Sequence, residues 1–284
     1  GLGRLTGTET RDAGNQVLVS HGYSGFDALD RRTVVDREDG KRWNYGYDAR
    51  GEVTSAKKSF PAGEGGAALA GWASSYLYDS IGNRIASSDF AATLPAAGSP
   101  LRSDYQADSL NQYDQRTVPG RFALSGDAAA TATVAVTVDD VTVPVIRQGA
   151  VGAAKFWETE WTTANALDAA FGMVRVKATV ASHAPAGSVG TLFLPKTPEV
   201  FVHDRDGNLT QDGRWNYSWD AENRLIAMET RPELVQPAGV LPVEKRSKLQ
   251  FAYDFSGRRV RKQVFTWENA TASWAPESDF RFLW

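Results

Sequence analysis

The chain has 284 residues, a formal net charge of −3, 42% hydrophobic residues and 23% charged residues. This length allows one or two domains, and the composition is that of a chain that buries a core. The lack of a basic excess argues against nucleic acid as a partner, because phosphates would stay unneutralised. The absence of cysteine excludes disulfides and thiolate metal sites, and no window is apolar enough to span a bilayer.

A short motif recurs along the chain: an aromatic residue, Asp, two variable residues, and then Gly, Asn or Asp. The copy at Asp204 has His203 at the ring position, and the copy at Asp108 lacks the preceding ring. An Asp followed three residues later by Gly is the preference of a type I turn, and the carboxylate can accept the N–H two residues on. The fourth residue is in every copy a type that tolerates a left-handed backbone. Each copy therefore predicts strand, tight turn, strand. The turn residues are Asp27 and Asp30, Asp48 and Gly51, Asp79 and Gly82, Asp108 and Asn111, Asp204 and Gly207, Asp220 and Asn223, and Asp254 and Gly257.

The segments before these turns have the pattern of strands. Rings alternate with period two in the near-identical stretches 42–48 and 214–220, which places three rings on one face of a strand. We expect this face to be buried. The pairs Asp39-Gly40 and Asp212-Gly213 predict two-residue hairpins at the opposite strand ends. The alternation of the two turn types predicts an all-β antiparallel ribbon. The rings are Trp43, Tyr45 and Tyr47 in the first stretch, and Trp215, Tyr217 and Trp219 in the second.

Three copies carry a wider resemblance: YDARGEV at 47–53, WDAENRL at 219–225 and YDFSGR at 253–258. They resemble the YD-repeat, or Rhs (rearrangement hotspot), family, over roughly residues 1–116 and 200–284. The resemblance implies a β-spiral that can close into a shell, in a secreted or cell-surface bacterial protein. It also implies partners: the rest of a longer parent polypeptide and an enclosed or C-terminal toxin or effector domain. The family's autoproteolysis is linked to an Asp-Pro segment, which this sequence lacks.

Both ends of the chain fall within a repeat. Gly3-Arg4-Leu5-Thr6 matches the end of a copy whose Asp would precede residue 1, and Phe282-Leu283-Trp284 resembles a strand that leads into a further Asp. We expect the chain to be a slice of a longer protein.

The motif is absent between Asn111 and His203, and residues 117–199 predict an inserted β-sandwich. Stretches 133–138, 141–143 and 173–180 alternate in period two and are rich in β-branched residues. We expect three domains: 1–116 as the first part of the spiral, 117–199 as the sandwich, and 200–284 as the second part. Residues 164–171 fit one short helical turn. Some inserted sandwiches of the family resemble carbohydrate-binding modules.

Candidate chemistry centres on Trp157-Glu158-Thr159-Glu160-Trp161. Paired carboxylates between aromatics occur in glycosidases, but neighbours at i and i+2 on one strand also form an ordinary solvated face. Trp157 and Trp161 offer a stacking platform for sugar, or pack in the sandwich core.

No metal or cofactor site is predicted elsewhere. Asp204-Arg205-Asp206-Gly207-Asn208 resembles a calcium loop only faintly, because its Gly stands at the wrong position, and a repeat turn is the favoured interpretation. His21, His183 and His203 form no zinc or nucleophile pattern.

The sequence thus favours a non-catalytic structural role without cofactor or metal. The alternatives are a carbohydrate- or cell-surface-binding module in the inserted sandwich and, third, a glycosidase.

Overall fold

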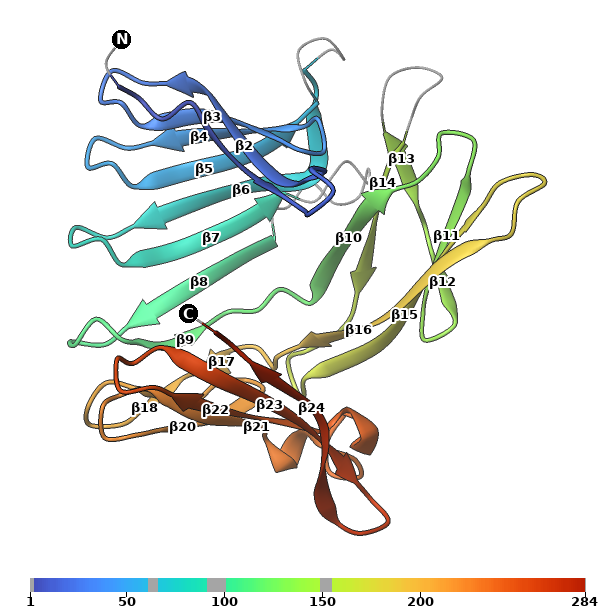
Figure 1. The fold of residues 1–284 in the computed structure, drawn as a ribbon. Coiled ribbons are helices and arrows are strands. Elements are labelled where there is room, and N and C mark those ends of the chain that lie inside the picture. Colours follow the sequence, from blue (N-terminus) through green and yellow to red (C-terminus); the bar gives the residue numbers. More distant parts are fainter. Residues whose placement is uncertain (1–2, 61–65, 91–100, 149–154, 284) are drawn as a thin grey trace. The chain divides into compact units, whose positions relative to one another are not determined.

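The computed structural model describes residues 3–60, 66–90, 101–148 and 155–283. The described chain is all-β with antiparallel sheets, as predicted, and contains no α-helix (Figure 1). It forms two compact units. The first comprises Gly1–Asp104, Arg121–Thr162 and Met173–Gly190, and the second comprises Tyr105–Gly120, Thr163–Gly172 and Thr191–Trp284.

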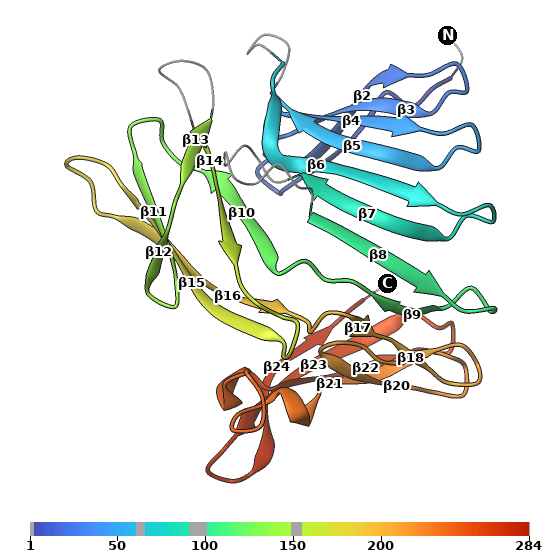
Figure 2. The ribbon, with the colours of Figure 1, turned by 180° about the vertical axis from the view of Figure 1, so that it is seen from behind.

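The main sheet of the first unit is an up-and-down ribbon in which each strand pairs with the next along the chain. Figures 1 and 2 both show β3 to β8 side by side in chain order. The last of them passes into the second unit within its length. The strands are β1 (Gly7–Arg11), β2 (Val17–Phe26), β3 (Arg32–Arg37), β4 (Arg42–Tyr47), β5 (Val53–Ser59), β6 (Ala68–Tyr78), β7 (Arg84–Phe90) and β8 (Leu101–Ala107).

The segment predicted as a sandwich contains two small antiparallel sheets. Strands β11 and β12 of one sheet contact β14 of the other, and Val136, Val138, Phe156 and Val174 are buried in this region. The first sheet has the order β10 (Arg121–Asp127), β14 (Phe156–Thr162), β13 (Ile146–Gln148). The second has the order β12 (Val141–Val143), β11 (Thr133–Val138), β15 (Ala170–Thr179), β16 (Ala186–Leu194).

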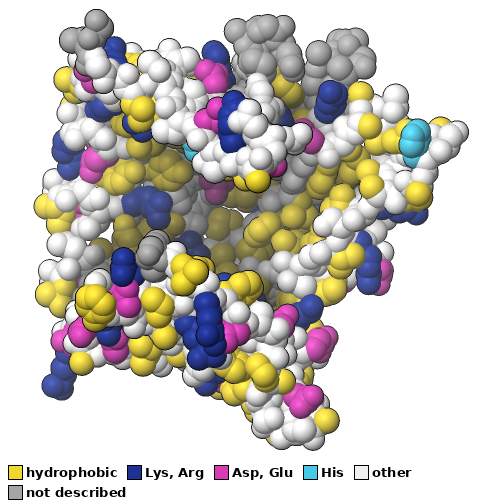
Figure 3. All heavy atoms as spheres, viewed as in Figure 1, with side chains coloured by type: hydrophobic (Ala, Val, Ile, Leu, Met, Phe, Trp, Pro, Cys, Tyr) yellow, Lys and Arg dark blue, Asp and Glu magenta, His cyan; other side chains and the backbone are white. Residues whose placement is uncertain are grey.

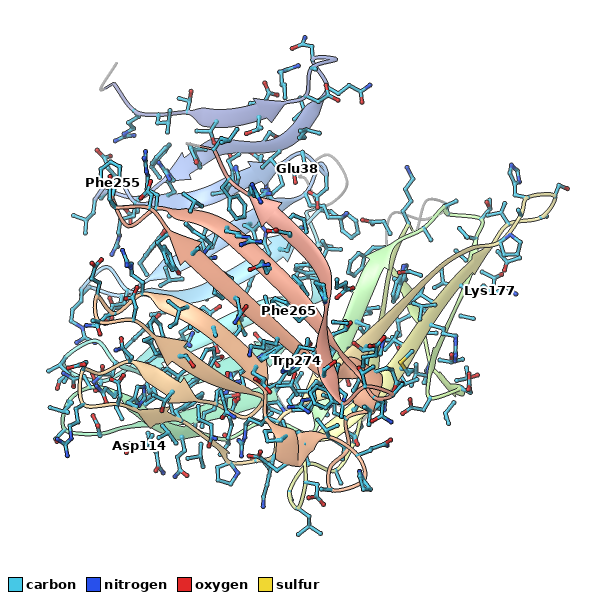
Figure 4. All side chains as sticks on the ribbon, turned by 60° about the horizontal axis from the view of Figure 1, so that its bottom comes forward. Glu38, Asp114, Lys177, Phe255, Phe265 and Trp274 are labelled. Carbon is cyan, nitrogen blue, oxygen red and sulfur yellow. The ribbon has the colours of Figure 1, made fainter. Side chains whose placement is uncertain are left out.

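The second unit carries another ribbon, again in chain order. Its last strands present Phe265 and Trp274, while Phe255 stands at a turn and is 99% exposed (Figure 4). Strand β9 (Tyr113–Arg116) pairs with β17 (Glu199–Val200). The ribbon comprises β18 (Val202–His203), β19 (Leu209–Gln211), β20 (Trp215–Trp219), β21 (Leu225–Thr230), β22 (Ser247–Tyr253), β23 (Arg259–Glu268) and β24 (Ser273–Arg281), with 3-10 helices η2 (Pro232–Leu234) and η3 (Val243–Lys245).

All seven Asp motifs share one turn geometry. In the motif of Asp220, the Asp220 N–H donates to the Arg224 carbonyl (3.0 Å), and the Asn223 N–H donates back to the Asp220 carbonyl (3.0 Å). The Asp220 Oδ1 accepts the N–H groups of Glu222 (2.9 Å) and Arg224 (3.0 Å). The same four bonds recur in the other six motifs. The fourth residue always has a positive φ, from 57° at Asn223 to 96° at Gly82.

The aromatic residue before the Asp ties one motif to the previous one. The hydroxyl of Tyr78 donates to the carbonyl of Val53 (2.9 Å), five residues after the preceding Asp48. Three other rings donate to the equivalent carbonyl, five residues after the Asp of the motif before. They are Tyr47 to Arg32 (2.7 Å), Trp219 to Leu209 (2.8 Å) and Tyr253 to Leu225 (2.8 Å).

A guanidinium reinforces this link in two motifs. Arg31 donates from Nε to Asp27 Oδ2 (2.6 Å), and its guanidinium lies 4.7 Å from the ring centre of Tyr47 in the next motif. Arg224 donates to Asp220 Oδ2 (2.8 Å) and lies 5.3 Å from the ring of Tyr253. One carboxylate therefore closes its own turn and fixes a cation over the next aromatic ring.

Three sequence predictions need correction. Asp39-Gly40 is not a two-residue hairpin: the Arg37 N–H donates to the Lys41 carbonyl (2.8 Å), so Gly40 (φ 72°) holds the fourth position of the same turn type. The period-two rings of β4 and β20 are half-buried rather than buried. Residues 164–171 form no helix, because the Asn165 amide donates to the carbonyls of Val118 (3.1 Å) and Pro195 (2.9 Å) and holds the segment open.

Gly257→Val should destabilise the second unit. Gly257 has a φ of 74°, and a Cβ there would meet no atom within 4 Å, so the loss of about 1–2 kcal/mol comes from the left-handed backbone alone. Thermal unfolding measures it. Gly257→Asn is the matched control, because Asn holds this position at Asn223; an equal loss in both variants contradicts the turn geometry.

Tyr253→Phe and Tyr47→Phe should each lower stability by about 1 kcal/mol, because each removes the hydroxyl that reaches the previous motif. Tyr45→Phe is the control, since the Tyr45 hydroxyl makes no hydrogen bond to a described residue. Chemical denaturation would argue against the link if all three variants matched the parent chain.

Candidate functional site

The motif aspartates serve as turn caps. The N–H groups and guanidinium of Arg224 hold the pKa of Asp220 below its usual range, and Arg258 does the same to Asp254. In the suspected calcium loop, the Asp204 carboxylate accepts hydrogen bonds from the Asp206 N–H (3.0 Å), the Asn208 N–H (2.8 Å) and the Asn208 Nδ2 (3.1 Å). Within the described residues, no group of three or more His, Asp and Glu could hold a metal ion.

The Asp-motif turns of the first unit lie at the same end of its strands. The turns at Asp27, Asp48 and Asp79 each join two neighbouring strands. The left edge of the space-filling view, where they lie, mixes hydrophobic with charged side chains (Figure 3). Leu29 and Ile81, each two residues after the Asp, are exposed.

Trp157 is not the exposed platform that sugar stacking requires. It is 7% exposed, and a Cβ added at Gly126 on the paired strand β10 would lie 2.9 Å from its Cζ2. Trp161 is half-buried. Trp157 therefore packs in the core, which was the alternative to sugar stacking.

Glu158 and Glu160 do not form a solvated face either. Glu158 is 5% exposed, and the side chain of Glu160 is 9% exposed. Glu160 Oε2 pairs with the guanidinium of Arg121 on β10. Glu160 Oε1 is buried without a hydrogen-bond partner among the described residues. Neighbouring strands screen both carboxylates from bulk water.

The two carboxylates line a cleft of about 430 Å³ inside the first unit. Its aromatic walls come from three strands: Trp43 of β4, Trp72 of β6 and Phe122 of β10. Trp43 and Trp72 meet edge to face with ring centres 5.9 Å apart. The Trp72 indole N–H donates to Ser125 Oγ (2.8 Å), which fixes the ring against β10.

The backbone of β6 reaches the carboxylates at Gly71. Gly71 has a φ of 72°, and a Cβ there would lie 3.1 Å from Glu158 Oε2. A side chain at this position would crowd the carboxylate. Gly71 therefore lets the ribbon approach Glu158 closely.

The two glutamates of the cleft have different electrostatic environments. Burial, and then the nearby charge of Glu160, raise the pKa of Glu158 to about 7. The guanidinium of Arg121 lies on Glu160. Glu158 can therefore hold or release a proton near neutral pH.

Sequence patterns singled out Glu158 and Glu160 but missed their partners. Trp43, Trp72 and Arg121 stand far apart in the chain, and no local spacing connects them to β14. The WETEW stretch was the only sequence signal for this cleft. Its alternation indicates the strand β14 but not the strands that cover it.

Comparisons with known proteins leave the family open. No protein-family model matches the chain, and no curated protein does. Among solved structures, TcdB2-TccC3-TEV is similar over 98% of this chain and 13% of its own, at 11% identity and a TM-score of 0.36. A similarity this low supports no argument about function.

Glu158→Gln should change the pH dependence of stability. The pKa of Glu158 is about 7 in the folded chain against 4.5 as the ordinary value. Its contribution to stability is thus fully present below 4.5 and is lost as the pH rises to about 7. Relative to the parent chain, the variant should gain up to about 3 kcal/mol between about pH 5 and pH 8. Thermal unfolding at both pH values measures this; a pH-independent difference contradicts the shift.

Proposed function

We propose that the chain is a non-catalytic structural segment of an Rhs/YD-repeat protein, part of a β-shell or stalk wall that encloses or presents a toxin or effector domain. The observation that carries this proposal is the repeated hydrogen bond from the aromatic side chain of one motif to a backbone carbonyl of the motif before it. Because four of the seven motifs bond in this way to the motif before them, the sheet can extend motif by motif.

The burial pattern supports a wall. In β18 to β24, Thr230 is the one buried residue, and in β1 to β4 Val35 is the one buried residue. Most other side chains are half-buried or exposed. A sheet of this kind has a face that further polypeptide can cover.

The partners that follow from this role are the rest of a parent polypeptide and an enclosed or C-terminal toxin or effector. The protein would act in secreted form or at the bacterial cell surface. The net charge of −3 offers no basic excess for nucleic acid. None of the helices in the described part of the chain has the length and hydrophobicity to cross a membrane.

The two alternatives have less support. Sugar stacking would need an exposed ring, but Trp157 is buried and packs over Gly126. For a glycosidase, the pKa of Glu158 is suitable, but Glu160 is bound to Arg121. A binding role for the inserted sheets remains compatible with the wall.

Limited proteolysis of the native polypeptide that contains this chain tests the wall. We expect the YD segments, together with any enclosed segment, to survive as one protease-resistant particle, whose image by electron microscopy shows a sheet around internal density. Gly257→Val should open the particle and shorten the survival of the enclosed segment. A native polypeptide in which nothing covers either ribbon face would overturn the proposal.

A further inference from the structure

We propose that the cleft lined by Glu158, Glu160, Trp43, Trp72 and Phe122 is a binding site for an alkylammonium group of the size of a lysine side chain. The site lies wholly within the first unit. Four features support it: the balance of charge, the buried carboxylate oxygen, the aromatic walls and the size.

Negative groups outnumber positive ones in the cleft. Three carboxylates line it, Asp89, Glu158 and Glu160, against the single guanidinium of Arg121. Arg121 is engaged with Glu160, and Asp89 accepts a hydrogen bond from Ser74 Oγ (2.5 Å). A monocation would reduce the repulsion between Glu158 and Glu160, whereas an anion would increase it.

Glu160 has an acceptor that the described chain leaves unused. Its side chain is 9% exposed, and Oε1 has no hydrogen-bond partner among the described residues. A buried, unsatisfied carboxylate oxygen costs free energy unless a donor reaches it. An ammonium group brings three N–H donors on a compact charge, so one group can serve Glu160 and Glu158 together.

The protein's nearby lysines are committed elsewhere. Lys58 Nζ donates to Asp39 Oδ2 (2.7 Å), and Lys41 Nζ to Asp127 Oδ2 (2.9 Å). Lys58 nonetheless lies 4.6 Å from the ring centre of Trp72. The fold thus already places an ammonium near one of the rings that line this cleft.

The walls and the volume suit an alkyl chain that carries the charge. Trp43, Trp72 and Phe122 provide apolar surface for methylene groups and ring faces for a cation. The volume of about 430 Å³ lies in the range of small-ligand sites. A bare metal ion fits less well, since the three carboxylates of the cleft do not form a group that could hold one.

The test is a titration of the folded chain with n-butylammonium chloride at about pH 8, followed by NMR chemical shifts, at ionic strength matched with sodium chloride. n-Butanol serves as the neutral probe of the same length, and methyl glucoside as the sugar probe. We expect saturable binding of the ammonium and none of the other two. Glu158→Gln and Glu160→Gln should each weaken binding about tenfold.

Glu9→Gln is the matched control, because Glu9 lies outside the cleft and its loss should leave the affinity unchanged. Glu158→Gln also guards against misfolding of Glu160→Gln, which loses the pair with Arg121. The proposal fails if the ammonium does not saturate, if butanol or the glucoside binds equally well, or if neither cleft variant weakens binding.

Discussion

The structure depends on one carboxylate per motif. Its Oδ1 closes a turn by accepting two backbone N–H groups, and in the motifs of Asp27 and Asp220 its Oδ2 holds an Arg over the ring of the next motif. The ring donates in turn to a carbonyl of the motif before it. Local turn chemistry thus becomes contact between hairpins, which explains how a ribbon with so few buried side chains has a defined register.

The turns were readable from sequence because their causes are local. Asp at the first position and Gly, Asn or Asp at the fourth determine the hydrogen bonds within five residues. An eighth turn that begins with Asp was not predicted: Asp12 accepts the Gln16 N–H (2.8 Å), and Asn15 has a φ of 63°. Asp12 follows Arg11 and Asp108 follows Ala107, so neither turn has a preceding ring. The ring therefore links hairpins and is not needed for the turn itself.

The cleft was not readable in the same way. Alternation in WETEW predicts which residues share a face of β14, but the burial of that face depends on β4, β6 and β10. The ring alternation of β4 failed for a related reason: period two places Trp43, Tyr45 and Tyr47 on one face, while the depth of burial depends on what covers that face. The domain boundaries at 116 and 199 remain a prediction, because they too depend on which distant segments pack together.

The two parts of the first unit therefore use charge in opposite ways. In the ribbon, each motif carboxylate accepts two backbone N–H groups, so its charge serves geometry. In the cleft, burial and then the nearby charge of Glu160 raise the pKa of Glu158 to about 7, and one oxygen of Glu160 lacks a donor among the described residues. A scaffold gains nothing from such an arrangement, since two apolar residues would pack there at lower cost. The imbalance is understandable if a cation from outside the described chain completes it.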